Sequence, residues 1–74
     1  MIHFNLEAAL RGSPVVTRDG HPVIQLTYFK DCTESHCLCA VVNDRLESFT
    51  REGRYLGEDD SYYDLFMASI EHTN

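Results

Sequence analysis

The sequence predicts an α+β fold, with a short N-terminal helix packed on a four- or five-stranded antiparallel β-meander and a short C-terminal helix or strand. Three observations carry this prediction. Good helix formers cluster near the N-terminus, β-branched and aromatic residues then recur in short runs, and turn-forming residues separate those runs. A length of 74 residues predicts a single domain, residues 1–74.

The predicted helix begins after Asn5, which is a favourable N-cap, and ends at Gly12. Glu7 lies in its first turn, where the helix dipole favours an anion. A helix of about two turns is not stable alone, so packing on the sheet must hold it. The residues expected to face the sheet are Leu6, Ala9 and Leu10.

Two strands are expected next, at residues 15–17 and 22–29, joined by a tight hairpin. The hairpin prediction rests on Asp19-Gly20, because this pair readily adopts left-handed backbone geometry. The second run alternates along its length. We expect one set of side chains to face the core, Ile24, Leu26 and Tyr28, and the other set to face away, Val23, Gln25, Thr27 and Phe29.

Three further strands are expected in the centre of the chain. Residues 37–42 form a continuous apolar run, typical of a central strand. Asn43-Asp44 then predicts a turn, residues 45–50 a returning strand, and Gly53 a second turn into a strand at residues 54–56. The charges on this part of the chain suit an exposed sheet edge.

The closing segment allows two interpretations. Ser61 followed by Asp64 fits a capping box, which predicts a short helix through Leu65, Phe66 and Ile70. The alternative is an extended segment at residues 64–67 that closes the sheet. A flexible acidic loop at residues 57–60 precedes both.

The charge balance is strongly acidic. Twelve Asp and Glu residues against six Lys and Arg give a formal net charge of −6. Direct binding to nucleic acid is disfavoured, because no basic stripe is present to neutralise phosphates; a positively charged protein partner is favoured instead. No apolar run approaches the ~20 residues of a membrane span, and no secretory signal is seen, so we expect a cytoplasmic protein that is a monomer or a weak dimer.

Three cysteines cannot all pair, and without an export signal we expect reduced thiols that pack as small apolar residues. Zinc binding is the alternative, because four ligand types fall close together: Cys32, His36, Cys37 and Cys39. For a catalytic pair of Cys32 and His36, the sequence shows neither a group that would orient the imidazole nor an oxyanion hole. The sequence therefore predicts neither catalysis nor a cofactor.

Two long stretches resemble a group of small phage-encoded proteins. The first is Phe4-Asn5-Leu6-Glu7-Ala8-Ala9-Leu10-Arg11-Gly12 with Pro14 to Gly20; the second is Leu46-Glu47-Ser48-Phe49-Thr50, Glu52-Gly53-Arg54-Tyr55 and Asp64-Leu65-Phe66-Met67. His36-Cys37-Leu38-Cys39 departs from the pattern of that group. The resemblance implies a phage or prophage origin, and many small acidic phage proteins inhibit host defence, anti-CRISPR proteins among them.

These observations lead to a functional hypothesis. The chain is expected to inhibit a host defence complex, with a CRISPR effector as the leading candidate, by presenting a DNA-like acidic surface to a basic nucleic-acid-binding site. The alternatives are a phage accessory or virion-associated module that binds partners through a sheet edge, and a small zinc module. The expected contact residues are Glu47, Glu52, Glu58, Asp59, Asp60, Asp64, Tyr62 and Tyr63.

Overall fold

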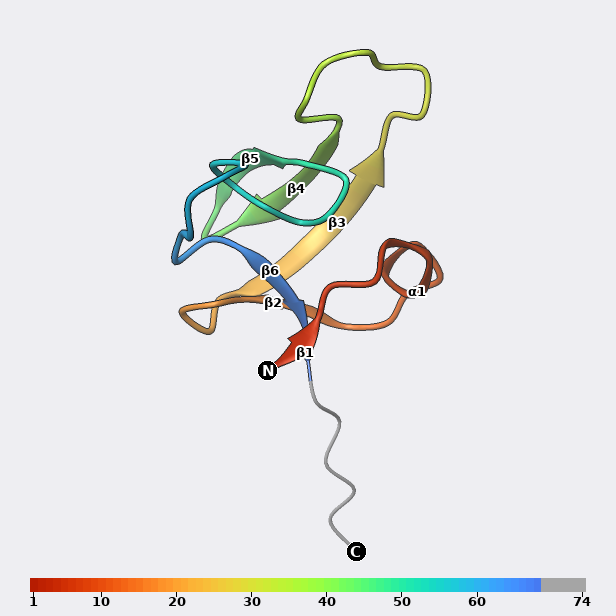
Figure 1. Cartoon of the computed structure of the whole chain (residues 1–74). Coiled ribbons are helices and arrows are strands. Elements are labelled where there is room, and N and C mark those ends of the chain that lie inside the picture. The colour runs from red at the N-terminus through yellow and green to blue at the C-terminus, as the bar shows by residue number, and fades with distance from the viewer. Residues whose placement is uncertain (69–74) are drawn as a thin grey trace, which may run out of the picture.

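A computed structural model describes residues 1–68 of the chain. The described part is mostly antiparallel β-sheet, with one small helix (Figure 1). Its six strands form a single sheet in the order β1-β6-β2-β3-β4-β5. The elements are β1 (Ile2–His3), α1 (Leu6–Leu10), β2 (Val15–Thr17), β3 (Pro22–Tyr28), β4 (Leu38–Val42), β5 (Arg45–Phe49) and β6 (Leu65–Met67). The prediction was therefore right about the antiparallel sheet and the N-terminal helix. It was wrong about a meander of four or five strands, because the sheet has six strands and β6 lies between β1 and β2.

Helix α1 begins as its capping residue predicts. The Asn5 Oδ1 accepts a hydrogen bond from the Ala8 backbone N–H at 3.0 Å. Ala9 is buried, and Leu6 packs against the core. Leu10 is 49% exposed, so its expected place on the packed stripe was wrong. Leu10 is the last residue of this five-residue helix and is followed by exposed residues 11–14.

The hairpin between β2 and β3 forms at the Asp-Gly pair. Gly20 has a φ of 93°, the left-handed region that favours glycine. Its N–H donates to the Thr17 carbonyl at 3.0 Å, and the Thr17 N–H donates to the His21 carbonyl at 2.9 Å. Val15 then pairs with Val23. This hairpin is confirmed.

A β-bulge in β3 changes which side chains face the core. The register with β4 shifts between Ile24 and Thr27, and Gln25 within the shift has a φ of 55°. One extra residue on β3 reverses the inward and outward alternation. Leu26 and Tyr28 pack against the core as predicted. Before the bulge the prediction was wrong: Val23 is buried, and Ile24 is 55% exposed.

The β4–β5 hairpin follows the predicted turn. Asn43 and Asp44 both have positive φ, 52° and 66°, and all five residues of β4 pair with β5. Strand β4 lies between β3 and β5 and carries much of the core, as its apolar run predicts. The expected strand at residues 54–56 does not form. Instead the Thr50 N–H bonds to the Arg54 carbonyl at 2.8 Å, which folds the chain back after β5.

The closing segment is a strand, so the helix prediction was wrong and the extended alternative is confirmed. Strand β6 lies between β1 and β2. One of the two capping-box bonds forms, because the Asp64 side chain accepts from the Ser61 N–H. The Ser61 hydroxyl accepts from the Tyr63 N–H instead of from Asp64, whose N–H donates to the Ser61 carbonyl. They close one turn, after which pairing with β1 and β2 holds the chain extended. Ile70, part of the predicted helix, lies outside the described residues.

The core lies on one side of the sheet, under α1 and the long connection from β5 to β6. Its largest fully buried apolar side chains come from β4 and β5 and are Leu38, Val42 and Phe49. Thr17 and Asp64 are the buried polar residues. In the part of the chain that the structure describes, no helix is long and apolar enough to cross a membrane.

Candidate functional site

A buried carboxylate organises the chain around the predicted acidic loop. Asp64 is only 1% exposed, and each of its oxygens has partners. The Oδ1 accepts from the Tyr55 backbone N–H at 2.9 Å. The Oδ2 accepts from the Ser61 backbone N–H at 3.0 Å and from Arg18 Nη2 at 3.1 Å, and lies 3.4 Å from Arg54 Nε. Burial of this charge is thus compensated by hydrogen bonds and two arginines.

The two arginines come from distant parts of the chain. Arg18 lies in the β2–β3 hairpin, where its backbone N–H donates to the Asp64 carbonyl at 2.8 Å and its Nε donates to the Ser61 carbonyl at 3.0 Å. Arg54 follows the turn after β5. Asp64 precedes β6, which pairs with β2, so sheet pairing brings the three side chains together.

The acidic loop, defined here as Gly57–Asp60, is fastened to the same arginines. Asp60 Oδ1 lies 3.0 Å from Arg54 Nη2 and 3.7 Å from Arg18 Nη2, although its side chain is 79% exposed. Arg54 Nη2 also donates to the Glu58 carbonyl at 3.2 Å. The loop backbone is therefore held against the fold, while the Glu58 and Asp59 side chains stay exposed.

The environment of Asp64 favours its charged form. Burial opposes ionisation and raises its pKa. Hydrogen bonds from the Tyr55 and Ser61 N–H groups and from Arg18, together with the charge of Arg54, outweigh burial, so the pKa of Asp64 is lowered. Asp64 is therefore an ionised, structural carboxylate at neutral pH.

An open cleft of about 610 Å³ lies beside this cluster. Its polar wall includes Arg18, Arg54 and Glu52, with the acidic loop contributing Gly57 and Asp60. Phe4 and Phe66 are the aromatic residues of its lining. The guanidinium of Arg18 lies 4.9 Å from the centre of the Phe66 ring, so the charged and aromatic parts of the lining are in contact.

The predicted acidic residues do not form one continuous surface. Asp64 is buried, so its prediction as a contact residue was wrong: its carboxylate is used by the fold. Asp60 is exposed but paired with Arg54. Glu47 is half-buried and accepts a hydrogen bond from the Tyr55 hydroxyl at 3.1 Å, which, with the charge of Glu47, raises the pKa of Tyr55. Within residues 1–68, the exposed carboxylates without an ion pair at this site are Glu52, Glu58 and Asp59.

The two predicted anchor tyrosines lie in different environments. Tyr62 is 75% exposed and follows the acidic loop closely. Tyr63 is half-buried and packs against the core, with its ring centre 5.3 Å from that of Tyr55 and 6.4 Å from that of His21. Tyr62 is therefore available to a partner, whereas the Tyr63 ring supports the fold.

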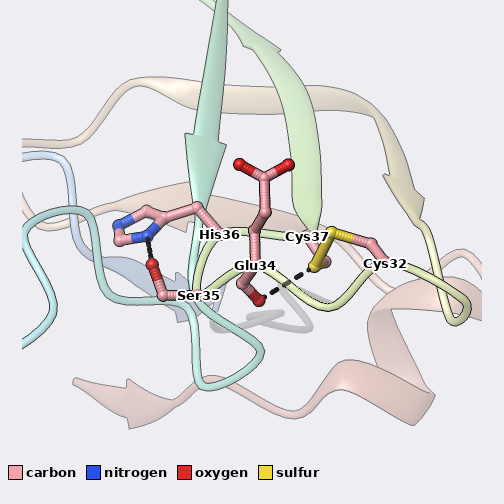
Figure 2. Close-up of a disulfide and its surroundings, with 5 residues drawn as sticks. All are labelled: Cys32, Glu34, Ser35, His36 and Cys37. Atoms are coloured by element: carbon pink, nitrogen blue, oxygen red, sulfur yellow. Dashed lines mark hydrogen bonds between the residues drawn. A yellow bond between two sulfur atoms is a disulfide. The ribbon is translucent and has the colours of Figure 1, made fainter.

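The cysteine-rich segment holds a disulfide. Cys32 and Cys37 are bonded (Figure 2), so the prediction of reduced thiols was wrong for these two. Cys39 is free. The Cα atoms of the pair lie 5.8 Å apart, because the loop between β3 and β4 folds back on itself. Cys37 Sγ also lies 3.1 Å from the Glu34 carbonyl oxygen, a contact only, since a disulfide sulfur has no hydrogen to donate.

The four candidate zinc ligands do not converge in this arrangement. The disulfide occupies Cys32 and Cys37, and Figure 2 shows the His36 ring pointing away from them. His36 Nε2 donates to the Tyr55 carbonyl at 2.8 Å, so its Nδ1 accepts from the Ser35 hydroxyl at 2.8 Å in the neutral ring. Among the described residues, no group of His, Cys, Asp and Glu side chains is placed to hold a metal ion.

Sequence reasoning missed the residues that build this site, Arg18 and Arg54. It also missed a polar cluster in the β2–β3 hairpin. There Asp19 Oδ1 accepts from the Thr17 hydroxyl and lies 2.9 Å from His21 Nδ1, and these two hydrogen bonds lower the pKa of Asp19. Thr17, Asp19 and His21 lie close together in the sequence, around the Asp-Gly turn. The contact between Arg18 and Asp64 follows only from the order of the strands in the sheet.

The chain was compared with known proteins at three levels. No protein family, no curated protein and no solved structure matches it. Proposals about function therefore depend on the residues and geometry described above.

Proposed function

We propose that this protein is a phage or prophage inhibitor that binds a basic, nucleic-acid-binding site on a host defence complex, with a CRISPR effector as the leading candidate. One observation carries the proposal: Glu58 and Asp59 project from a loop whose backbone is fastened to the fold, and neither has an ion-pair partner within residues 1–68. Exposed carboxylates held in place in this way suit a basic partner.

Neighbouring residues extend this surface. Glu52 is exposed and lines the same cleft as Gly57 and Asp60 of the acidic loop, so its carboxylate is included in the proposed surface. Tyr62 supplies an exposed aromatic ring next to them, the residue type that protein interfaces favour as an anchor. The proposed contact is therefore Glu52, Glu58, Asp59 and Tyr62, with Asp60 at its border.

The number of unpaired charges limits what the surface can imitate. Arg18 and Arg54 neutralise Asp64 and Asp60, which leaves the three carboxylates of Glu52, Glu58 and Asp59. Duplex DNA carries one charge per ~1.7 Å of its axis, so three charges correspond to only ~5 Å of duplex. The proposed surface therefore replaces a few phosphates in a basic cleft and does not copy a long duplex.

The proposed place of action is the host cytoplasm. That compartment is reducing, and disulfides there are rare. Action in the cytoplasm therefore requires the fold to persist when Cys32–Cys37 is reduced. The disulfide closes a sequence separation of only five residues and lies in the β3–β4 loop, away from the acidic loop, so we expect the fold to tolerate reduction.

Affinity purification from cells of a bacterial host tests the proposal. The wild-type chain is compared with a variant carrying Glu52→Gln, Glu58→Gln and Asp59→Asn. A charge-matched control carries Glu7→Gln, Asp31→Asn and Glu34→Gln, which are exposed residues elsewhere on the chain. Proteins captured by the wild type are identified at low salt and again at high salt.

The expected result is a nucleic-acid-binding host protein that is captured by the wild type and by the control and is released at high salt. The acidic variant should bind that protein at least about tenfold more weakly, because the removed charges face the basic site. Equal capture by the acidic variant and the control would contradict the proposal.

A further inference from the structure

The edge strand β5 carries an exposed apolar side chain at its centre. Strand β5 ends the sheet, and β4 is its only neighbouring strand within residues 1–68 (Figure 1). Leu46 lies at the middle of β5 and is 76% exposed, more than any other large hydrophobic residue of the described chain. An edge strand of this kind is a template for pairing with another strand.

The backbone of Leu46 faces outward from the sheet edge. Positive φ values at Asn43 and Asp44 mark a two-residue turn, and in such hairpins the flanking pair, here Val42 and Arg45, exchanges hydrogen bonds. Alternation along β5 then directs the N–H and C=O groups of Leu46 away from β4. Thr50 lies four residues after Leu46, so its N–H also points away from β4. It donates to the Arg54 carbonyl.

An apolar row leads from the middle of the sheet to this edge. Val41 pairs with Ile24 on one side and with Leu46 on the other. Val42, next to Val41, and Val23, next to Ile24, are buried in the core. Because neighbouring residues of a strand face opposite sides of the sheet, the row lies on the side away from the core. Ile24 is 55% exposed and Val41 is half-buried. The row therefore ends at Leu46 with no apolar neighbour beyond it.

The charges of β5 indicate what pairs with this edge. When two copies of an antiparallel strand pair around Leu46, Leu46 lies opposite itself and Arg45 lies opposite Glu47 of the second copy. The two-fold symmetry forms this Arg–Glu pair twice. Pairing centred on Arg45 or on Glu47 would instead place two like charges directly opposite each other.

We infer that β5 is a self-pairing edge, through which two copies of this chain form an antiparallel dimer centred on Leu46. The outward N–H and C=O groups of the two Leu46 residues bond to each other, and the apolar rows of the two copies join into one. The partner is a second copy because the strand is complementary in charge to itself in this register. This inference does not depend on the proposed function, since neither Leu46 nor Arg45 belongs to the proposed contact.

Sedimentation velocity of the full chain over a wide concentration range tests the dimer. We expect a concentration-dependent dimer for the wild type. Leu46→Lys should raise the dissociation constant at least about 100-fold, because it places two like charges at the symmetry axis and removes the apolar contact. The control is Leu56→Lys, which changes a leucine that is also exposed (57%) but lies outside β5; this variant should dimerise like the wild type.

A charge exchange tests the register. Arg45→Glu alone and Glu47→Arg alone should each weaken the dimer by about tenfold, and the double variant should recover most of the wild-type affinity. The Glu47→Arg single variant and the double variant both lose the Tyr55 contact, so comparing them isolates the pair between copies. Circular dichroism confirms that each variant is folded.

Three outcomes would overturn the inference. They are a wild-type chain that stays monomeric at every concentration, a dimer that Leu46→Lys leaves intact, and a double variant no better than its single parents. A monomeric wild type that adds a strand from an unrelated protein at β5 would assign the edge to a different partner.

Discussion

Asp64 shows how a residue that looks like part of a surface can be part of the core. In the sequence it follows Glu58, Asp59 and Asp60, and its capping-box spacing from Ser61 does not mark it as buried. Its burial depends on Arg18, which is 46 residues away in the chain. A long-range ion pair leaves no signature in a single sequence, so the acidic character of the segment could be predicted but the role of each carboxylate could not.

Removing the charge of Asp64 should destabilise the fold. Asp64→Asn keeps the size of the side chain but leaves Arg18 and Arg54 without their buried counter-charge, so we expect a loss of about 2–4 kcal/mol in the free energy of unfolding. Urea denaturation at neutral pH measures it. The control is Asp59→Asn, at an exposed position, which should change stability by less than about 0.5 kcal/mol. Similar losses in both variants would contradict the structural role of Asp64.

The lowered pKa of Asp64 also predicts how stability depends on pH. Because the pKa of Asp64 is lower in the folded than in the unfolded chain, its contribution is complete above the unfolded value of ~3.9 and is lost as pH falls through the folded value. Between about pH 7 and about pH 3, the free energy of unfolding measured by urea denaturation should therefore fall more for the wild type than for Asp64→Asn. Parallel losses would show that other carboxylates cause the acid sensitivity.

At the scale of elements, local patterns predicted most strands and failed where one residue changed the register. The turns at Asp19-Gly20 and Asn43-Asp44 could be predicted from the sequence, because the positive φ that they need depends on the residues of the turn itself. The bulge at Gln25 was not, since a glutamine in a strand carries no signal for a positive φ. That single residue decides whether Val23 or Ile24 faces the core.

Gly53 connects the turn after β5 to the N-terminal segment, and its replacement tests that contact. A Cβ at Gly53 would lie 2.8 Å from ring atoms of Phe4, at a φ of 84°. Gly53→Ala should therefore cost more than about 2 kcal/mol of unfolding free energy. Gly57→Ala, with a similar φ of 91° and open space around it, should cost only about 1 kcal/mol. Thermal or urea unfolding separates the two, and equal costs would mean that Phe4 does not pack there.

The disulfide between β3 and β4 makes a prediction about thiol chemistry. Alkylation of the denatured, unreduced protein should label Cys39 alone, whereas reduction first should allow all three cysteines to be labelled. Mass spectrometry counts the labels. Reduction should lower the free energy of unfolding by about 2 kcal/mol, as expected for a short loop, without unfolding the chain. Labelling of three cysteines without reduction would contradict the disulfide.

At the scale of the whole molecule, the sheet order could not be predicted. A meander through β2, β3, β4 and β5 follows the chain, and the turn residues indicate it. Strand β6 instead lies between β1 and β2, which joins the two ends of the described chain. This closure brings Asp64 to Arg18 and so positions the acidic loop. The site is therefore a product of topology, while the sequence alone predicted only the acidic character of its loop.

In the proposed function, Glu52, Glu58 and Asp59 occupy a site where a partner otherwise holds nucleic acid. The most direct measurement is competition on the captured host protein, by fluorescence anisotropy of a labelled nucleic acid that this protein binds. We expect the wild-type chain to displace the nucleic acid, and the Glu52→Gln, Glu58→Gln, Asp59→Asn variant to displace it at least about tenfold less well. A stable complex containing both the chain and the nucleic acid, with neither affinity changed, would contradict it.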